Sequence, residues 1–280
     1  MPTQIIPVPY DSGHPNVRMG RGPVHLVNHG LKHLKRSGIH VDAVEVEASF
    51  PLEMVTAVHV AKALSSKVRE ARKQGRFPLV LAGNCMSSIG TLAGLGTSPT
   101  GIIWLDAHGD FNTPETTLSG FMDGMALATA VGRCWHKLTA TVPGFRPVPE
   151  ANVVLLGARD LDAAERTALD SSAVRLIEPG AIRRLGVREA LANPLAELQN
   201  KVGQVYLHID LDVLDVAEAR INQFAVTGGL TLQDVLTVVQ TVRERLKIAA
   251  AAITAYDPDY DADGKALRAG TVLIQELCTE

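Results

Sequence analysis

The chain has 280 residues, a length that fits one large α/β domain with a sizeable core. Hydrophobic residues make up 46% and charged residues 20%, which excludes a disordered chain, and a net charge of −3 provides no basic field for nucleic acid or an anionic membrane. The three cysteines, Cys85, Cys134 and Cys278, lie far apart in the sequence and indicate no disulfide framework. The sequence shows no signal peptide and no apolar run long enough to span a bilayer, so we expect a cytoplasmic protein.

Short β-rich apolar runs alternate with longer segments in which apolar residues recur every three or four positions. In chain order, the pattern predicts strands at 3–9 and 41–47, a helix at 54–73, strands at 77–83, 101–107, 152–158, 174–179 and 205–215, a helix at 231–247 and a strand at 248–257. This alternation indicates an α/β fold with a mostly parallel sheet that helices cover on both faces. Because no linker, charge block or internal repeat divides the chain, we predict a single domain over residues 1–280.

Polar side chains stand where two of these strands end, which is where open parallel sheets bind ligands. The fourth predicted strand ends D-A-H-G-D, and alternate residues share a face, so Asp106, His108 and Asp110 point together if the extended run continues. The seventh ends H-I-D-L-D, which places Asp210 and Asp212 on one face. Four carboxylates in such proximity repel one another unless cations lie between them, and carboxylates with imidazole suit a divalent ion such as Mn²⁺.

Each of these residues also has an ordinary interpretation. A lone Asp after a strand is usually a turn or N-cap residue, and a lone cysteine such as Cys85 is more often a small buried apolar residue than a ligand. Two acidic motifs at two strand ends together favour a metal site, with His208 a further candidate on the face of Asp210. Two ions that share a carboxylate bind and deprotonate a bridging water.

Several segments together resemble the ureohydrolase family, which includes arginase and agmatinase. They are PYDSGHPNVRMGRGP, DAHGDFNTPETTLSG, HIDLDVLD and DPDYDADG, which follow the order of the family over nearly the whole chain. The resemblance implies a three-layer α/β/α sandwich on an eight-stranded, mostly parallel sheet, and hydrolysis of C–N bonds of guanidino or related groups at two Mn²⁺ ions per chain. It also implies that Asp106 and Asp210 bridge the ions, that Asp110 binds one ion, and that His108 and Asp212 bind the other.

The same resemblance assigns residues to the amino-acid end of a substrate. Asn112, Thr117 and Ser119 match positions that hold this end in arginase, and Asp162 matches the position that reads the α-amino group, with Glu165 nearby. Glu165 has the alternative interpretation of an acid in the first turn of a helix. The matches favour a small-molecule L-α-amino acid substrate over agmatine, which lacks the carboxylate.

Three positions depart from the family pattern. Cys85 stands where the remaining metal ligand is a histidine; its thiolate is a competent ligand, but it makes the ligand shell one charge more negative and, as a soft donor, could shift the preference towards Zn²⁺. Ala255 stands where the family carries a glutamate that grips the guanidinium or a functional water. Asp123 replaces a histidine thought to shuttle protons, and alternatively it is a helix N-cap.

These departures favour a substrate less basic than arginine. The combination of a cysteine at the position of the histidine ligand and no glutamate at position 255 resembles one branch of the family. That branch hydrolyses Nω-hydroxy-L-arginine to hydroxyurea and L-ornithine in D-cycloserine biosynthesis. In that interpretation a metal-bridging hydroxide attacks the hydroxyguanidine carbon, Asp110 orients it, and Asp110 and Asp123 are the candidates for protonating the leaving amine.

Three alternatives remain open. One is arginase itself or a hydrolase of another guanidino acid, and the second is a non-catalytic ureohydrolase homologue. The third, a zinc deacetylase-like enzyme on the same general fold, fits less well with Asn112 and Ser119. Because the sequence stops at LRAGTVLIQELCTE, without the C-terminal tail that arginases use to build trimers, we expect a monomer or a different dimer rather than an arginase-type trimer.

Overall fold

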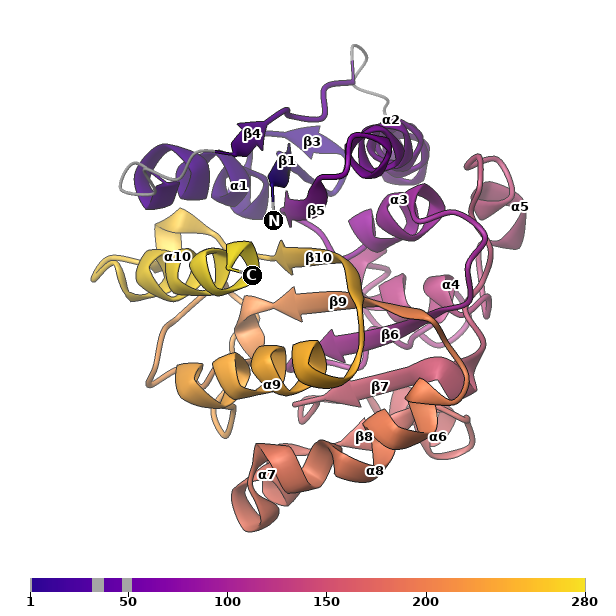
Figure 1. Ribbon diagram of the computed structural model, residues 1–280, viewed down its shortest axis with the longest axis vertical. Helices are drawn as coiled ribbons and strands as arrows, with labels where there is room; N and C mark the ends of the chain where they lie inside the picture. Colours follow the sequence, from indigo (N-terminus) through magenta and orange to yellow (C-terminus); the bar gives the residue numbers. More distant parts are fainter. Residues whose placement is uncertain (1, 32–37, 47–51, 280) are drawn as a thin grey trace.

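Eight parallel strands form one sheet in the computed structural model, which describes residues 2–31, 38–46 and 52–279 (Figure 1). The strand order is β4-β1-β5-β10-β9-β6-β7-β8, and each of these neighbouring pairs is parallel. The strands are β1 Thr3–Val8, β4 Ile39–Val41, β5 Phe77–Ala82, β6 Thr100–Leu105, β7 Val153–Leu156, β8 Arg175–Ile177, β9 Gln204–Asp210 and β10 Ile248–Thr254. A short antiparallel pair, β2 Tyr10–Asp11 and β3 His14–Pro15, lies apart from this sheet.

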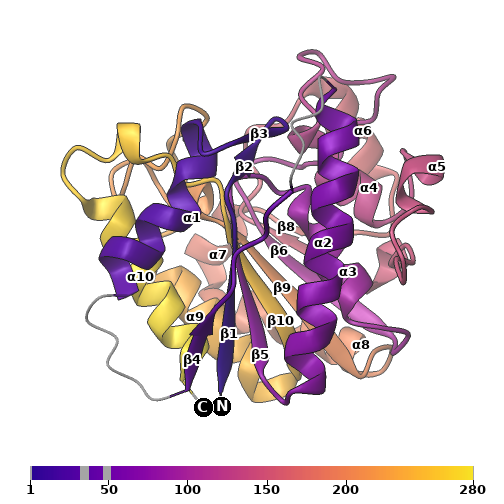
Figure 2. The same ribbon diagram turned by 90° about the horizontal axis from the view of Figure 1, so that it is seen from above.

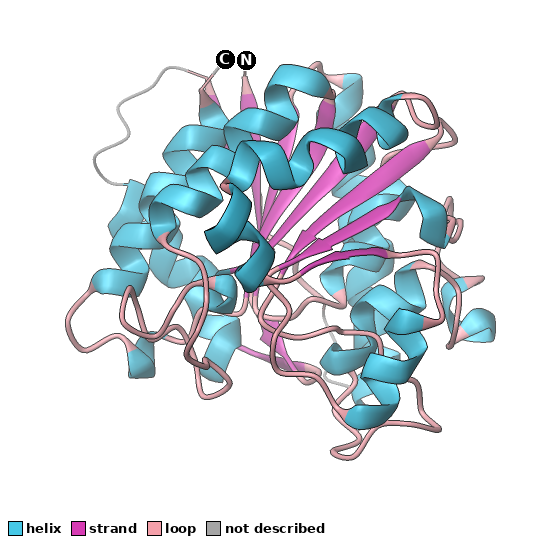
Figure 3. Cartoon of the chain, turned by 90° about the horizontal axis from the view of Figure 1, so that it is seen from below, coloured by secondary structure: helices cyan, strands magenta, loops and turns pink. Residues whose placement is uncertain are grey.

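Helices cover both faces of the sheet, which confirms the predicted α/β/α sandwich (Figures 2 and 3). One face carries α1 Gly22–His25, α7 Pro179–Leu185, α8 Val187–Gln199, α9 Leu232–Arg245 and α10 Lys265–Cys278. The other carries α2 Glu53–Lys73, α3 Ser87–Gly94, α4 Ala126–Ala130 and α6 Ala163–Asp170, with the short α5 His136–Thr139 beyond them. None of the helices in the described part of the chain is long and apolar enough to cross a membrane.

The central strands are buried on both faces, which explains their continuous apolar runs. In β6, Ile103 and Leu105 pack into the core beneath α7 to α10, whereas Ile102 and Trp104 pack into the core beneath α2, α3 and α4. Side chains that alternate along a strand in this way fix which face each residue reaches. The face on which Trp104 lies is also the face that leads to the candidate site.

The two predicted helices are confirmed as α2 and α9, and the sequence of α9 explains where that helix begins. In α9 the buried residues Val235, Val238, Val239 and Val242 follow the helical spacing, and the helix begins with a capping box between Thr231 and Asp234. This capping satisfies backbone groups at the helix start that would otherwise lack partners.

The predicted strand over 41–47 is mostly wrong. The observed strand β4 ends at Val41, residues 42–46 are not strand, and residue 47 lies outside the described part of the chain. Backbone bonds from Asp42 N to Ile5 O (3.0 Å) and from Val44 N to Pro7 O (2.8 Å) still follow β1. Because β4 lies at the edge of the sheet, this segment has a partner on one side only, so its alternating sequence is not enough to keep it in a regular strand.

Candidate active site

A cavity of about 310 Å³ lies beyond the carboxyl ends of the four central strands, as predicted for an open parallel sheet. Segments from distant parts of the sequence meet there, because β5, β10, β9 and β6 are neighbours in the sheet. All six predicted metal ligands line this cavity: Cys85, Asp106, His108, Asp110, Asp210 and Asp212.

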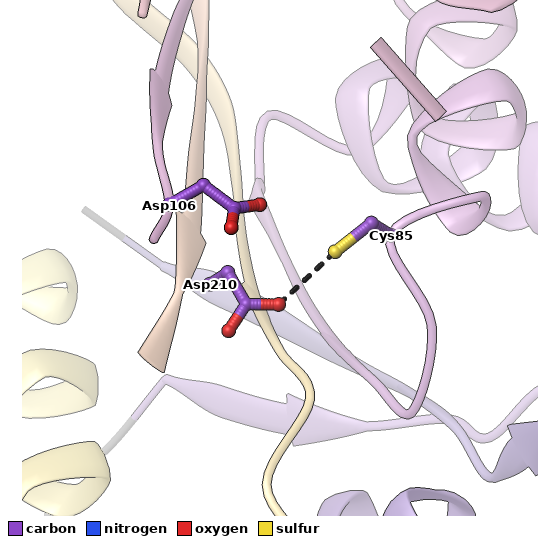
Figure 4. A group of neighbouring side chains, drawn as sticks. All are labelled: Cys85, Asp106 and Asp210. Carbon is purple, nitrogen blue, oxygen red and sulfur yellow. Dashed lines mark hydrogen bonds between the residues drawn. The ribbon is translucent and has the colours of Figure 1, made fainter. Parts of the chain in front are cut away.

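One buried group of candidate ligands consists of Cys85, Asp106 and Asp210, whose ligand atoms all lie within 4.8 Å of one another (Figure 4). Asp106 follows β6, Asp210 is the last residue of β9, and Cys85 lies in the loop after β5. The Cys85 thiol donates to Asp210 Oδ2 at 3.2 Å. A thiol and two carboxylates in such an arrangement have the chemistry of a divalent-metal site.

A second group shares Asp106 and adds His108 and Asp212, again with the ligand atoms within 4.8 Å of one another. His108 Nδ1 lies 3.2 Å from Asp106 Oδ1 and 3.5 Å from Asp212 Oδ2. The two groups therefore share a carboxylate, as a site for two adjacent ions requires. Asn222 donates to Asp212 Oδ2 at 3.3 Å and to the Ala255 carbonyl at 2.9 Å, and thereby joins two loops of the site.

The expectation that Asp106, His108 and Asp110 share a face of one extended run is wrong. The strand ends at Leu105, and Asp110 adopts a left-handed conformation with φ 49°. Asp212 likewise lies in a 3-10 turn, Leu211–Val213, and not in the strand. The residues nevertheless converge because each loop turns back over the strand ends, and aspartate tolerates the left-handed conformation better than most side chains.

Electrostatics favour cations within this arrangement. Burial raises the pKa of the Asp106, Asp110 and Asp210 carboxyls. Nearby carboxylates raise it further: Asp212 acts on Asp106 and Asp210, and Asp106 acts on Asp110. Burial opposes the charged form of His108, but the carboxylates of Asp212 and Asp106 outweigh it and raise its pKa to about 10. A field that favours an imidazolium so strongly would also favour divalent cations.

Asp110 supplies a second sign of a missing partner. Its Oδ2 atom is buried and accepts no hydrogen bond from the described residues, whereas buried carboxylate oxygens are normally paired. The oxygen belongs to a residue that lines the same cavity as the two ligand groups. The donor set, its burial and this unpaired oxygen together fit a site for two divalent ions.

Close backbone packing brings Cys85 to the site. A Cβ atom on Gly83 would lie 2.3 Å from the Tyr10 carbonyl oxygen, so only glycine permits the loop after β5 to pass so near the loop after β1. Burial and nearby carboxylates raise the pKa of the Cys85 thiol well above its usual range. The thiol therefore keeps its proton until a metal replaces it.

His208 is not a candidate ligand, although it lies on the same face of β9 as Asp210. Its ring is fully buried, and both ring nitrogens have neighbours: Nδ1 lies 2.7 Å from the Tyr206 hydroxyl and Nε2 lies 3.2 Å from Thr254 Oγ1. Burial lowers its pKa to about 3. His208 is therefore a neutral residue beneath the site.

The residues predicted for the amino-acid end of a substrate are only partly brought together. Asn112 Nδ2 donates to Asp162 Oδ2 at 3.1 Å, and both residues line the cavity with Ser119 and Glu165. Thr117 does not line the cavity; its hydroxyl accepts a bond from Gly120 N in the loop that carries Ser119.

Glu165 lies in the first turn of α6, the alternative that the sequence left open. Its side chain nevertheless has a further contact, because Oε1 accepts the Phe111 amide at 2.8 Å. Burial raises the pKa of Glu165 to about 7. The residue therefore connects α6 to the loop that carries Asp110 and Asn112.

Asp123 begins a 3-10 turn, but its carboxylate does not cap that turn. It accepts bonds from Met86 N at 2.8 Å and Asn84 Nδ2 at 3.0 Å, and burial raises its pKa to about 7. Ala255, the third departure from the family pattern, also lines the cavity and contributes no polar side chain to it.

Sequence reasoning missed several residues of the cavity. Asp160 Oδ2 lies 3.9 Å from His108 Nε2, and the ring of Phe224 lies 6.5 Å from the ring of His108 at 88°. Phe224 also stacks on Phe121, at 5.5 Å and 24°. Asp160 could have been predicted from the sequence, because it lies two residues before Asp162. No feature of the sequence predicts the contact between Phe121 and Phe224, which are far apart in the chain.

Comparison with known proteins matches this geometry to a family. The model of the arginase family matches residues 2–279. The chain belongs to the arginase family. It is 31% identical to the arginase of Bacillus caldovelox over 298 aligned positions, which cover 100% of this chain and 98% of that protein. The crystal structure of the same enzyme superposes with a TM-score of 0.89 at 29% identity, covering 100% of this chain and 98% of that one.

A second relative, the arginase of Bacillus subtilis, is 34% identical over 217 positions, covering 76% of this chain and 73% of that protein. Membership of the arginase family confirms the predicted ureohydrolase resemblance and the α/β fold. It assigns the chain to metal-dependent hydrolases of linear amidines, and the two candidate metal groups agree with this class.

Proposed function

We propose that the chain hydrolyses the guanidino group of an L-α-amino acid at two divalent cations, with Mn²⁺ the expected metal. The observation that carries the proposal is a pair of candidate metal groups that have Asp106 in common. One group is Cys85, Asp106 and Asp210, and the other is Asp106, His108 and Asp212. A hydrolase of the arginase family needs such a pair of sites. The relatives compared above are arginases, which supports L-arginine as the first substrate to test.

The side chains of the cavity have distinct roles in this proposal. Asp106 and Asp210 would be shared by the two ions, Cys85 and Asp110 would complete one site, and His108 and Asp212 would complete the other. Bound Mn²⁺ supplies Lewis acidity and lowers the pKa of a water molecule, so that a hydroxide nucleophile is available near neutral pH.

The unpaired Oδ2 of Asp110 is a free acceptor that can orient this water towards the guanidino carbon. Asp110 and Asp123 are the candidates for delivering a proton to the leaving amine. Asp123 is suited to this because burial raises its pKa to about 7, and a general acid works best when its pKa is near the working pH.

Asn112 and Asp162 would hold the amino-acid end of the substrate. Their mutual hydrogen bond uses one Nδ2 hydrogen of Asn112 and one carboxylate oxygen of Asp162, which leaves the second hydrogen for an α-carboxylate and the second oxygen for an α-ammonium group. Ser119 and Glu165 line the same cavity and would complete these contacts. Thr117 would act indirectly, by holding the loop of Ser119.

Nω-hydroxy-L-arginine is a second candidate substrate, favoured by Cys85 and Ala255. Ala255 contributes no acid to the cavity, so a strongly basic guanidinium loses a charge-assisted hydrogen bond, typically about 1.5–3 kcal/mol. The electron-withdrawing hydroxyl lowers the basicity of the group and offers an oxygen to the metals. The thiolate of Cys85 also makes the centre more negative than an imidazole would.

A turnover assay of the manganese-loaded chain tests both candidates. L-Arginine, Nω-hydroxy-L-arginine and agmatine are supplied separately, and ornithine or putrescine is measured, with chelator-treated protein as control. Ornithine from either amino acid supports the proposal, and the ratio of the two kcat/KM values chooses between the candidates. Putrescine from agmatine alone would contradict the role of Asn112 and Asp162.

Metal analysis of the same protein addresses the alternative of a non-catalytic homologue. Two ions per chain support the proposed centre. A chain that binds no metal and turns over none of the three substrates would overturn the proposal.

A further inference from the structure

Two fully buried side chains, Trp104 and His208, lie directly beneath the candidate metal centre. Trp104 and His208 each precede a shared carboxylate by two residues, so they lie on the same strand faces as Asp106 and Asp210. Trp104 and His208 are also register partners in the β6–β9 ladder. Their rings stack at 3.6 Å with an interplanar angle of 11°.

Each ring is connected to one of the two carboxylates. Trp104 Nε1 donates to Asp106 Oδ2 at 3.1 Å. His208 reaches Asp210 through Thr254, whose hydroxyl lies 3.2 Å from His208 Nε2 and donates to Asp210 Oδ2 at 3.2 Å. The stacked pair is therefore connected to both carboxylates that the two ions would share, directly to Asp106 and through Thr254 to Asp210.

The chemistry of these groups determines which one donates and which one accepts in each hydrogen bond. Thr254 has one hydroxyl hydrogen and uses it towards Asp210, so it accepts from His208 Nε2–H. A neutral imidazole that donates from Nε2 accepts at Nδ1, and the Tyr206 hydroxyl donates there at 2.7 Å. Each donor thus points towards the carboxylate of Asp210.

We propose that the stacked Trp104–His208 pair positions the metal centre by fixing the orientations of the shared carboxylates Asp106 and Asp210. The inference rests on the metal centre of the proposed function but not on its substrate. Trp104 acts directly on Asp106, and His208 acts on Asp210 through Thr254. Both are positioning residues, because neither lines the cavity or supplies a metal ligand.

The geometry explains why a histidine is suited to a fully buried position. A carboxylate can rotate about its last bond, and two ions accept only a narrow range of oxygen positions. An imidazole is rigid, stacks flat on the indole and has two nitrogens with opposite roles, one accepting and one donating. In metal sites generally, residues that hydrogen-bond to the ligands help to maintain metal affinity. Loss of one such hydrogen bond typically lowers the affinity about tenfold to a hundredfold.

The test measures metal affinity by competition with a chelator and uses variants that each remove or move one polar group. His208→Asn can replace Nδ1 but does not reach Thr254, whereas His208→Gln can replace Nε2. Thr254→Val removes the hydroxyl at nearly constant volume, and Trp104→Phe removes the donor to Asp106. Thr129→Val is the matched control, because Thr129 is also buried and, among the described residues, its hydroxyl bonds only to the Met125 carbonyl and Cys134.

We expect His208→Asn, Thr254→Val and Trp104→Phe each to weaken Mn²⁺ binding about tenfold or more, with His208→Gln closer to wild type and Thr129→Val unchanged. Cobalt-loaded protein gives a second readout, because a thiolate–Co²⁺ charge-transfer band reports on the Cys85 site. The band should shift in His208→Asn, which leaves the 3.3 Å contact between Thr254 Oγ1 and Cys85 Sγ in place. Near-ultraviolet circular dichroism identifies variants that do not fold. If His208→Asn is one of these, Thr254→Val tests the same connection to Asp210.

If the Thr254→Val and Trp104→Phe proteins fold, bind metal with wild-type affinity and have an unchanged cobalt spectrum, the positioning inference is overturned. The proposed function would not be affected by this result. Wild-type protein that binds no divalent metal would overturn the proposed function as well. Failure of every substrate with two tight ions bound would leave the positioning role standing and remove only the assigned substrate.

Discussion

Ala255 lies at the cavity with a backbone φ of 66° and only 3% exposure, and its carbonyl accepts a bond from Asn222. We expect Ala255→Glu to lower the KM for L-arginine about tenfold, because a new charge-assisted hydrogen bond contributes about 1.5–3 kcal/mol. Steady-state kinetics on arginine and hydroxyarginine measure the change. Ala255→Gln has the same shape without the charge and should lower the KM less; equal effects of both variants would contradict an electrostatic cause.

Phe121 and Phe224 form an aromatic wall beside the candidate ligand His108. In a cavity without an acid at Ala255, an aromatic face is a surface on which a planar guanidinium can rest. We expect Phe224→Leu to raise the KM for the guanidino substrate about threefold to tenfold. Metal content, measured in parallel, should stay at the wild-type value.

The control for this variant is Phe145→Leu, which trims a phenylalanine packed against the core beneath α2 to α4. It should leave the KM unchanged. If Phe224→Leu instead lost metal, the ring would be acting on His108 and not on the substrate.

Cys85 has a matched partner in Cys134, which is also buried but lines no part of the cavity. We expect Cys85→Ala to lose most of one of two bound ions, because it removes a ligand that no other described side chain near Asp210 replaces. Cys134→Ala should keep both. Elemental analysis after gel filtration measures the metal content, and two tightly bound ions in Cys85→Ala would remove the thiol from the ligand set.

At the scale of secondary-structure elements, one arginine holds the loops around the site together. Arg159 follows β7, and its guanidinium donates to six backbone carbonyls in three segments, at Gly157, at 212–214 and at 226–227. The bond to the Asp212 carbonyl is 3.0 Å long. The loop that carries a candidate ligand is therefore attached to the neighbouring strand end.

We expect Arg159→Met to lower the free energy of unfolding by at least about 2 kcal/mol, because buried carbonyls lose a charged donor. Metal affinity should fall with it, since Asp212 loses its backbone support. Urea unfolding and chelator competition measure the two effects. Arg183→Met removes a single exposed bond to Gly228 and should change stability by about 0.5 kcal/mol or less.

Element positions were largely predictable, because buried parallel strands have unbroken apolar runs and end where polar residues begin. Asp106 and Asp210 were placed correctly by this rule, since each stands at the end of a strand. The left-handed backbone of Asp110 and the 3-10 turn at Asp212 were not, because local sequence does not specify how a loop turns. The Trp104–His208 stack was also missed, since it depends on the register between β6 and β9.

At the scale of the whole molecule, the crowded carboxylates make stability depend on metal. Repulsion among Asp106, Asp110 and Asp210 weakens the metal-free fold, whereas cations in the proposed centre would bind the folded state and not the unfolded chain. At a free Mn²⁺ concentration 100 times the Kd, each bound ion adds about 2.7 kcal/mol of stability, which raises the Tm by roughly 5 °C per ion for a protein of this size.

Differential scanning calorimetry before and after chelation measures this shift, and restored Mn²⁺ should reverse it. Asp210→Asn, which removes a shared carboxylate, should show little metal dependence. A wild-type Tm that does not respond to chelator or Mn²⁺ would contradict a metal centre that is coupled to the fold.

The position of β10 in the sheet has a consequence for how the protein is made. β10 is the last strand in the chain, yet it lies between β5 and β9 at the centre of the sheet. Without it the sheet divides into two pieces, β4-β1-β5 and β9-β6-β7-β8, with Cys85 after the first piece and Asp106 and Asp210 on the second. During synthesis from the N-terminus, the two halves of the site cannot be joined until the ribosome has passed Thr254. Until then Asp106, His108 and Asp212 can come together, but Cys85 cannot reach Asp106 and Asp210, so the centre for two ions stays incomplete.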